Sequence, residues 1–472
     1  MSVVLEKELP KGWIITTLPF IVKNERYAIK RGPFGSHLKK QFFVESGYKV
    51  YEQQHVIKNN FSLGDYYIEE KKFQELKNFV IKAGDVLISC SGTVGEIAIV
   101  PKEFEKGIIN QALLKISLDP LIVETKFFIS LFIFWMLKAR IDSHGSSMRN
   151  LSSVKELKKL PISLPPLNEQ KRIVAKIEEL FSLVDSAKEN LEKTKLLLKQ
   201  YRQSILKHAF EGKLVPQDPN DEPASVLLEK IKKENPSQKT SNIVLEKELP
   251  MGWTVVNLES ISDLIGGGTP SRNNLEYFGG NIIWLTPTEI PKDRITRVSD
   301  SKEKITKLGL MKSSAKMIPK NSVLLTSRAS IGYVAIADNS LTTNQGFSSF
   351  VCHEPLYNFF LAYWLWGNKK ELESNATGTT FKEISKSKLR VLSIPLPPLN
   401  EQKRIVAKIE ESFSIIEKNE KLVDSLLLQY NQIKNSILKQ AFEGKLVPQD
   451  PNDEPAQILL EKIQQERKKN GK

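Results

Sequence analysis

Two glycine-rich loops carry the residue types in this chain that are best suited to chemistry. The run KRGPFGSHLKK at 30–40 places four positive charges around two glycines, and GGGTPSR at 266–272 sets three glycines before an arginine. Glycine backbone can approach a phosphate closely, and an arginine fork can bond phosphate or guanine through two hydrogen bonds. Glycine-rich loops are also common turns, so each loop alone is weak evidence. Together with the charge of the chain, they favour DNA as the ligand.

Polar side chains that could read base edges follow both loops. Glutamine suits adenine, and a carboxylate can accept a hydrogen bond from cytosine. Turns after two apolar runs, and a small polar loop at 145–152 that is matched at 378–385, add candidates, of which Arg328 is the strongest. For each of them an ordinary surface loop explains the sequence equally well. The candidates for DNA contact are Arg31, Gly35, Ser36, His37, Lys39, Lys40, Gln53, Gln54, Ser91, Thr93, Ser146, Ser147 and Arg149 in the first half, and Gly267, Gly268, Thr269, Ser271, Arg272, Thr286, Thr288, Glu289, Ser327, Arg328, Thr379, Thr380 and Lys382 in the second.

Composition narrows the class of protein. The chain has 472 residues, a net charge of +14 and a pI near 9.3, which is typical of a protein that binds a polyanion. The longest apolar run, 127–137, is too short to span a bilayer, and the N-terminus lacks the apolar core of a signal peptide. Two lone cysteines argue against a disulfide framework, and the five histidines show no metal-ligand spacing. We expect a cytoplasmic protein without a metal site.

Motifs for catalysis on DNA are missing from the sequence. There is no [DN]PP[YF] tetrapeptide of an adenine methyltransferase and no GxxxxGK[ST] phosphate loop. Asp293, Asp300 and Lys302 form the nearest approach to a nuclease cluster, but they lie in a charged run that is typical of a solvated face. We therefore expect no catalysis by this chain alone. The alternative is a self-contained DNA-modifying or DNA-cleaving enzyme with an unrecognised active site.

The elements that must position these loops are two tandem repeats. PPLNEQKRIVAKIEE at 165–179 returns unchanged at 397–411, and AFEGKLVPQDPNDEPA at 209–224 returns at 441–456. Both segments are displaced by the same offset, since 397 − 165 = 441 − 209 = 232. The stretches before them are variable but related: 81–100 resembles 318–337, and Asn110-Gln111 matches Asn344-Gln345. Each repeat therefore joins a variable domain to a near-identical ending.

Each near-identical ending predicts one long helix. From Ile173 to Ile205 seam positions recur in alternating steps of four and three, all apolar except Thr194, which is the seam of a coiled coil. The second copy keeps this seam with two polar breaks. A helix over 168–210 is about 64 Å long and needs a partner for its apolar stripe. The other copy, lying antiparallel, is the simplest partner. A helix packed only on its own domain and a parallel intermolecular coil are the alternatives.

The segment after each long helix is also identical in the two repeats. Gly212 and Gly444 predict helix C-caps, and the Pro/Asn/Asp turn that follows leads into a short amphipathic helix. Identity across a turn with few core residues has two explanations. The turn is a docking surface for partners that come in pairs, or the duplication is recent.

This order of segments resembles the specificity subunit of type I restriction-modification systems. The resemblance covers nearly the whole chain and includes GPFGSHLKK with YEQQHV, and GGGTPSRNNLEYFGGNIIWLTPTEI. It implies an α+β fold, with two globular α/β target-recognition domains separated by two long antiparallel coiled-coil helices in a pseudo-two-fold tandem repeat. The implied boundaries are 1–164 and 237–396 for the recognition domains, and 165–236 and 397–472 for the helical spacers with their docking segments.

The resemblance also implies a division of labour. Each variable domain reads one half of a bipartite double-stranded DNA site, and the paired helices set the spacer between the halves. Two modification subunits, which bind S-adenosylmethionine and methylate adenine, dock on the repeated parts, and restriction subunits join in some systems. The chain itself is then non-catalytic, holds no cofactor and has no membrane partner.

Overall fold

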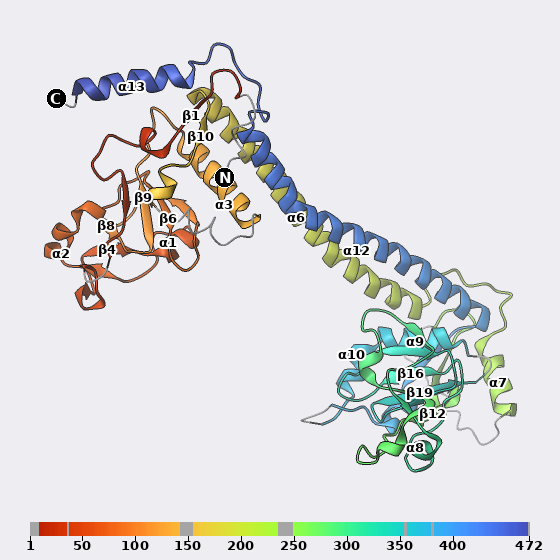
Figure 1. Cartoon of the computed structure of the whole chain (residues 1–472). Coiled ribbons are helices and arrows are strands. Elements are labelled where there is room, and N and C mark those ends of the chain that lie inside the picture. Colours follow the sequence, from red (N-terminus) through yellow and green to blue (C-terminus); the bar gives the residue numbers. More distant parts are fainter. Residues whose placement is uncertain are drawn as a thin grey trace. The chain divides into compact units, whose positions relative to one another are not determined.

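The computed structural model describes residues 9–34, 37–141, 154–234, 249–353, 356–378 and 382–470. The chain divides into two compact units, each of which combines a variable domain with parts of both long helices (Figure 1). Unit 1 comprises Met1–Leu191 and Ser425–Lys472, and unit 2 comprises Glu192–Asp424. No helix in the described ranges is long and apolar enough to cross a membrane.

The first variable domain is built on two four-stranded sheets and a short strand pair. One sheet has the order β2-β9-β6-β7, the other has the order β3-β5-β4-β8, and β1 pairs with β10. The strands are β1 (Ile14–Thr16), β2 (Ile29–Arg31), β3 (Phe43–Val44), β4 (Tyr48–Tyr51), β5 (Tyr67–Ile68), β6 (Val86–Ser89), β7 (Ile97–Ile99), β8 (Gly107–Ile109), β9 (Leu113–Ile116) and β10 (Ile162–Leu164). The helices are α1 (Gln53–Ile57), α2 (Glu70–Glu75), α3 (Thr125–Ile141) and α5 (Val154–Leu157).

The second variable domain repeats this plan. Its larger sheet has the order β12-β19-β16-β17-β14, its smaller sheet has the order β15-β13-β18, and β11 pairs with β20. The strands are β11 (Thr254–Asn257), β12 (Ser262–Gly266), β13 (Phe278–Leu285), β14 (Thr296–Val298), β15 (Lys304–Ile305), β16 (Val323–Thr326), β17 (Val334–Ala337), β18 (Thr342–Thr343), β19 (Phe347–Cys352) and β20 (Ser393–Leu396). The helices are α8 (Lys307–Met311), α9 (Asn358–Gly367), α10 (Lys369–Ser374) and α11 (Lys386–Arg390).

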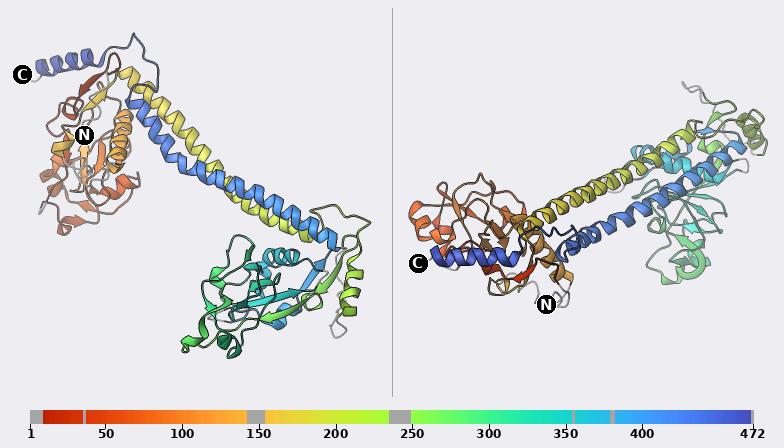
Figure 2. Two further views of the ribbon diagram at one scale, coloured as in Figure 1. Left: turned by 45° about the vertical axis from the view of Figure 1, so that its right-hand side comes forward. Right: turned by 90° about the horizontal axis from the view of Figure 1, so that it is seen from above.

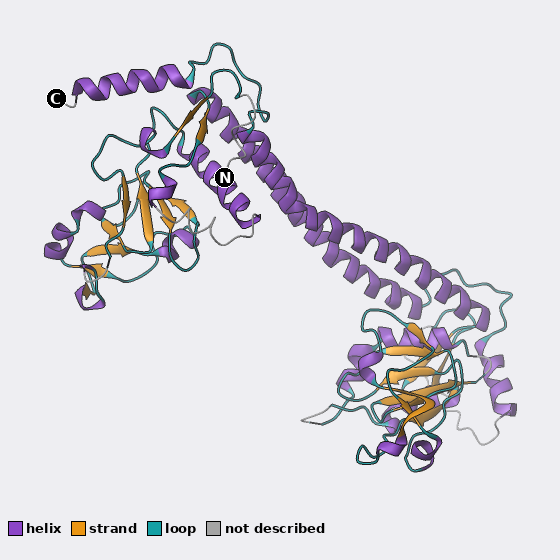
Figure 3. Ribbon diagram, viewed as in Figure 1, coloured by secondary structure: helices purple, strands orange, loops and turns teal. Residues whose placement is uncertain are grey.

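The two domains are therefore diverged copies of one topology. The order β2-β9-β6-β7 corresponds strand by strand to β12-β19-β16-β17, and the parallel pair β4 and β8 corresponds to the parallel pair β13 and β18. β6 and β16 are buried along their whole length, which explains why both are unbroken apolar runs with few polar residues. Figure 3 shows the strands of each domain gathered together with short helices around them.

The most apolar helix of each domain packs against a long helix. Phe442 lies at the end of one long helix. Its ring centroid is 5.5 Å from that of Phe127 and 5.3 Å from that of Phe134, both in α3. Phe210, its counterpart in the first repeat, contacts Phe360 of α9 at 5.5 Å. The apolar run at 127–137, which is too short to span a bilayer, and its counterpart in α9 thus anchor the long helices to the domains.

The predicted long helices are confirmed and are antiparallel within each unit. α6 (Leu167–Phe210) and α12 (Leu399–Phe442) have 44 residues each, and both end before a left-handed glycine. In unit 1 Lys434 lies over the ring of Phe181, and Lys188 lies over the ring of Tyr430. In unit 2 Lys195 bonds Asp424 at 2.7 Å, and Arg202 bonds Glu420 at 2.9 Å. Within each unit the residue number on α12 falls as the number on α6 rises, as antiparallel helices require. Within each unit, Figure 2 shows the parts of α6 and α12 running alongside each other.

The apolar seam is buried at the helix ends but not along its whole length. Ile173 and Ile177 are buried in unit 1, as Ile405 and Ile409 are in unit 2. Other seam positions are exposed, namely Tyr201 at 57%, Leu426 at 39% and Ile433 at 45%. Val423, between them, is buried at 5%, so the predicted continuous seam is covered at some positions and interrupted at others.

The identical segments have a role inside the fold. Arg172 of the first repeat bonds Asp453 of the second at 2.8 Å in unit 1, and Arg404 of the second bonds Asp221 of the first at 2.8 Å in unit 2. Each turn therefore packs against the start of the other repeat's long helix. The turns lead into α7 (Ala224–Glu234) and α13 (Ala456–Asn470), as predicted. Internal contacts thus account for part of the sequence identity.

Each helix start is also joined to the residue just before the first strand of its own domain. Trp13 donates a hydrogen bond to Glu169 at 3.0 Å, and Trp253 donates one to Glu401 at 3.0 Å. Burial raises the pKa of both carboxyl groups. The two ends of the helical frame are thus built from matching residues.

Candidate nucleic-acid interface

The two Asn-Gln pairs form the same turn in both variable domains. We call residues 110–111 and 344–345 the Asn-Gln turns. Asn110 N donates to Tyr51 O at 2.9 Å, and Asn344 N donates to Leu285 O at 3.0 Å. The side-chain oxygen of each asparagine accepts a hydrogen bond from the second residue after it, at 3.0 and 2.9 Å. The match predicted from sequence is therefore confirmed in geometry.

In each domain a glycine of the glycine-rich loop packs directly against the backbone of the Asn-Gln turn. A Cβ on Gly32 would lie 1.9 Å from Asn110 O, and a Cβ on Gly267 would lie 1.8 Å from Asn344 O. No other residue fits at either position, because the obstructing atom belongs to the backbone. The glycines that the sequence assigns to phosphate approach are thus required first for the approach of one loop to another.

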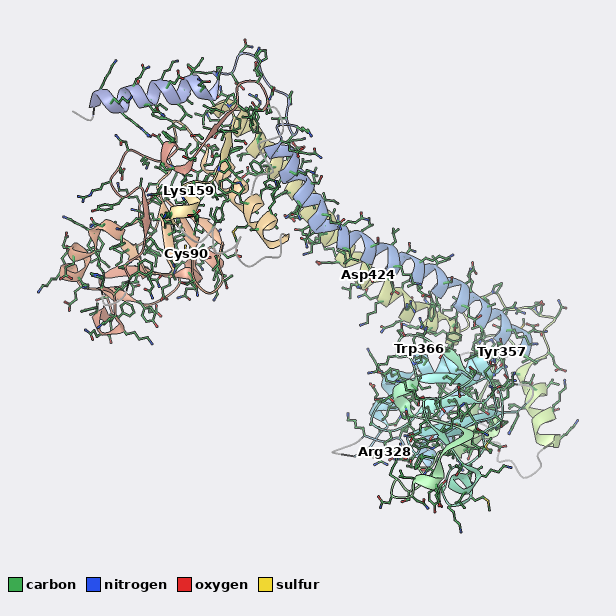
Figure 4. All side chains as sticks on the ribbon, viewed as in Figure 1. Cys90, Lys159, Arg328, Tyr357, Trp366 and Asp424 are labelled. Carbon is green, nitrogen blue, oxygen red and sulfur yellow. The ribbon has the colours of Figure 1, made fainter. Side chains whose placement is uncertain are left out.

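A third loop closes on the same turn from the end of β6 or β16. Cys90 N donates to Ala112 O at 2.7 Å, and Ser327 N donates to Gly346 O at 2.8 Å. Burial raises the pKa of the Cys90 thiol, labelled in Figure 4, to about 11, so it is protonated at neutral pH. The segments that meet around the turns form what we call the four-loop frame: 31–34, 52–54, 89–95 and 110–112 in the first domain, and 266–269, 286–289, 326–332 and 344–346 in the second.

Arg31 is the central cation of the first frame. Its guanidinium donates to Cys90 O and Gln111 O, both at 3.3 Å, and lies 4.9 Å from the ring centre of Phe34. The arginine therefore links three loops. Because its hydrogen bonds go to carbonyl oxygens and not to a carboxylate, they do not neutralise its positive charge. Phe34 beside it is 57% exposed.

The two glutamines proposed as base readers in the first domain make contacts within the protein. Gln54 donates to Glu52 at 3.1 Å. The Gln53 amide lies against Gly92, and its oxygen is buried without a hydrogen-bond partner among the described residues. Glu52 also accepts from the side chain of Asn110 at 3.3 Å. These glutamines support the frame in this structure.

The remaining described candidates of the first domain lie at the surface. The exposed residues are His37, Lys39, Lys40, Ser91 and Thr93. Lys39 and Lys40 lead into a short 3-10 helix, and Ser91 and Thr93 lie at the tip of the loop after β6. They are free to meet a phosphate or a base edge.

Arg272 of the second domain is already paired. Its two terminal nitrogens bond Glu303 at 2.5 and 2.8 Å, and its guanidinium lies over the rings of Phe278 and Trp284 at 4.6 and 5.1 Å. The predicted fork for guanine or phosphate is therefore occupied by a carboxylate. Sequence could not reveal a partner that lies 31 residues further along the chain.

Glu289 and Thr286 organise their own loop. Thr286 N and its hydroxyl donate to one oxygen of Glu289 at 2.8 and 2.7 Å, and Lys302 N donates to the other at 2.7 Å. The carboxylate that could accept from cytosine thus already accepts three hydrogen bonds. Thr288 is exposed, with its hydroxyl 3.0 Å from that of Thr286.

The other glycine-loop candidates of the second domain differ in exposure. Gly268 is buried, and its carbonyl accepts from the Trp284 indole at 2.9 Å. Thr269 bonds the side-chain oxygen of Gln345, and Ser271 is exposed. Of this loop, Thr269 and Ser271 present side chains outward.

The loop after β16 contains one buried and one exposed candidate. Ser327 is 3% exposed, and its hydroxyl lies 3.2 Å from that of Ser348, so its side chain does not reach the surface. Arg328 is half exposed, 3.7 Å from Glu383, and lies apart from Tyr357 in Figure 4. Lys382 is exposed, and its carbonyl accepts from Ala329 N.

Some candidates lie outside the described residues: Gly35, Ser36, Ser146, Ser147, Arg149, Thr379 and Thr380. Two exposed residues of the frames, Gln111 and Gln345, are not among the candidates, although the sequence match between their turns is visible. Among described residues, no group of three or more histidines, cysteines and acids could hold a metal ion.

Comparisons with known proteins agree on one family. The protein-family model described as the type I restriction modification DNA specificity domain matches residues 34–195 and 250–426. The specificity subunit of type I restriction enzyme EcoBI from Escherichia coli is 26% identical over 78% of this chain and 77% of that protein. The MjaIX specificity subunit from Methanocaldococcus jannaschii is 33% identical over 43% of this chain and 46% of that protein. The HsdS subunit from Thermoanaerobacter tengcongensis has the same fold, with a TM-score of 0.61 at 20% identity over 93% of this chain and 99% of that one.

Proposed function

Because this chain belongs to the type I restriction-modification DNA specificity family, we propose that each of its variable domains reads one half of a bipartite DNA site. The observation that carries the proposal is the four-loop frame, which has one backbone geometry in both domains and different side chains on it. Equal frames with unequal side chains suit two readers of different sequence. The family contributes DNA specificity and no catalysis, so the rival proposal of a self-contained enzyme has no support.

Charge supports DNA as the ligand of the frames. In the first domain Arg31, Lys39 and Lys40 lie on or beside the frame, and in the second Arg328 and Lys382 do so. Phosphate contacts of this kind supply most of the affinity and little of the specificity. Base readout then falls to the polar side chains between the cations.

A domain graft tests this proposal. Replacing residues 11–164 by residues 251–396 gives a chain with two second domains joined through the unchanged repeats. Expressed with the modification subunit of its system, this chain should direct methylation to an inverted repeat of one original half-site. Methylation mapping of the genome reads the result, with the unchanged chain as control. Retention of the original asymmetric site would refute the proposal.

The long helices are proposed to set the distance between the half-sites. Each has 44 residues, about 66 Å, and contributes residues to both units. Seven residues inserted into each helix, at positions matched by the antiparallel pairing, lengthen the pair by about 10 Å, or roughly three base pairs. The mapped site should then keep its half-sites and gain that spacing. An unchanged spacer would show that the helices do not measure it.

Two modification subunits are proposed to dock on the helix pair. Each unit presents the same pair of exposed apolar residues, related by the offset of the repeats: Leu183 and Leu428 in unit 1, and Ile415 and Leu196 in unit 2. Exposed apolar residues at equivalent positions in both units suit two copies of one partner. S-adenosylmethionine is expected on those partners, and restriction subunits are a further expected component.

Aspartate substitutions test the docking surfaces. Leu428→Asp and Leu196→Asp should each remove one modification subunit from the complex, as measured by native mass spectrometry. Leu275→Asp, at an exposed residue of the second domain outside the helices, is the matched control. Full binding of both partners to the double variant would place the docking surface elsewhere.

A further inference from the structure

The Asn-Gln turn keeps its residue types as well as its geometry in both domains. Gln111 lies between Asn110 and Ala112, each only 9% exposed, yet its own side chain is exposed. Gln345 is exposed in the same way before the buried Gly346. Because the neighbours are packed, the backbone of the turn is held in place. Each glutamine therefore projects outward from a well-supported corner.

Contacts within the described part of the domain do not account for the Gln111 side chain, and the Gln345 side chain makes one contact, with Thr269. Within the described residues Gln111 takes part in hydrogen bonding through its backbone carbonyl, which accepts from Arg31 at 3.3 Å, and its amide group makes no hydrogen bond. The Gln345 side-chain oxygen accepts from Thr269. Removal of either side chain would leave the hydrogen bonds of the Asn-Gln turn itself unbroken.

The surroundings of the glutamines differ between the domains although the turns do not. In the first frame Arg31 adjoins the turn, whereas in the second the equivalent residue is Gly266 and a Cβ there would lie 1.9 Å from the Lys386 amine. Phe34 in one loop corresponds to Thr269 in the other. The glutamine is thus the constant side chain of an otherwise changed surface.

We infer that Gln111 and Gln345 each bond an adenine in the major groove, one in each half-site. The inference rests on the proposed function and deepens it. A glutamine amide has one donor and one acceptor face, which match the N7 acceptor and the N6 donor of adenine. A side chain that both domains place alike is suited to a base that both half-sites share, while the changed side chains read the bases that differ.

Base analogues provide the test. The chain is co-expressed with its modification subunit, its site is mapped by methylation sequencing, and duplexes are made in which each adenine in turn is replaced by 7-deazaadenine, which lacks N7. Binding of these duplexes is compared for the unchanged complex and for complexes with Gln111→Ala or Gln345→Ala. Gln74→Ala, at an exposed glutamine of α2 that bonds Glu70 at 2.5 Å, is the matched control.

The expected pattern is specific to one half-site at a time. The unchanged complex should lose about 5- to 150-fold in affinity at one adenine of each half-site. Gln111→Ala should show no further loss at that adenine in the first domain's half-site, and full sensitivity in the other half. Gln345→Ala should show the reverse, and Gln74→Ala should behave like the unchanged complex.

Failure of this inference is distinguishable from failure of the proposed function. If the unchanged complex binds the mapped duplex no better than a scrambled one, the proposed function fails. If it discriminates while both glutamine variants remain sensitive to every analogue, the inference fails and the function stands. A uniform loss of affinity on all duplexes would assign the glutamines to phosphate contacts and would also overturn the inference.

Discussion

The two variable domains share a backbone frame and differ in how they bring positive charge to it. In the first, Arg31 extends from the residue before the key glycine and holds two carbonyls at 3.3 Å. In the second, that residue is Gly266, and the Lys386 amine occupies the space beside it. A cation thus returns to the frame from a different element. The frame therefore limits where side chains can be placed, not which segment supplies them.

The largest effect is expected from loss of the close approach that defines both frames. Gly32→Ala and Gly267→Ala put a Cβ at 1.9 and 1.8 Å from a carbonyl oxygen, so one loop must move and the domain should lose about 3 kcal/mol of stability. Thermal unfolding measures this loss. Methylation mapping should show that each variant impairs only its own half-site. Unequal losses would mean that the frames are not equivalent.

The next effect concerns the two ends of the helical frame. Arg404→Ala leaves the 6% exposed side chain of Asp221 without its guanidinium partner, and Arg172→Ala does the same to Asp453. Each should cost about 2 kcal/mol in the free energy of unfolding, measured by chemical denaturation. Lys408→Ala, which breaks an exposed pair on α12, is the control and should cost less than about 1 kcal/mol. Unequal losses of unfolding free energy for the two arginine variants would show that the two ends of the helical frame are not equally stable.

A smaller effect, on DNA affinity, is expected to distinguish Arg31 of the first domain from Arg272 of the second. Glu303→Gln should free the charge of Arg272, raise DNA affinity about fivefold and add about one to the salt dependence of binding. Arg272→Ala in the intact protein should change affinity little, because Glu303 neutralises the arginine. Arg31→Ala should weaken binding. Fluorescence anisotropy across salt concentrations measures all three, and a strong loss for Arg272→Ala would show that its ion pair opens on DNA.

The smallest effect is expected at the buried carboxyl groups. Burial raises the pKa of Glu401 above 4.5, so its ionisation opposes folding as pH rises through that raised pKa. Glu401→Gln removes the charge and keeps one oxygen that can accept from Trp253, but its amide nitrogen replaces the oxygen that accepts from Gln217 at 3.3 Å. The variant should therefore be only slightly more stable at neutral pH. The stability difference between the variant and the unchanged protein should vanish below pH 4.5, where Glu401 is protonated and therefore as neutral as glutamine. Glu169→Gln should give the same curve, and pH-dependent denaturation compares them.

The sequence predicted the framework far better than it predicted the side-chain contacts. The constant offset between the repeats, the long helices and the Asn-Gln match depend on local patterns that a reader can align. The pairing of Arg272 with Glu303 depends on how loops cross in space, and no spacing rule reveals it. Gln53 looked like a reader of bases because residue type alone does not show that its amide lies against Gly92. Solvent exposure distinguishes a side chain that can meet DNA from one that supports the fold. The exposure of a loop residue depends on tertiary packing, which local sequence does not give.

The cross-bonding of each turn to the other repeat has a consequence for biosynthesis. Unit 2 is one continuous stretch, Glu192–Asp424, and can fold as soon as it leaves the ribosome. Unit 1 needs Asp453 for Arg172 and Phe442 for α3, so it stays incomplete until residues 425–470 emerge. At ordinary elongation rates of about 5–20 residues per second, the first domain waits roughly 14 to 56 s for the 281 residues between Arg172 and Asp453. The segment translated first is therefore the last to be finished.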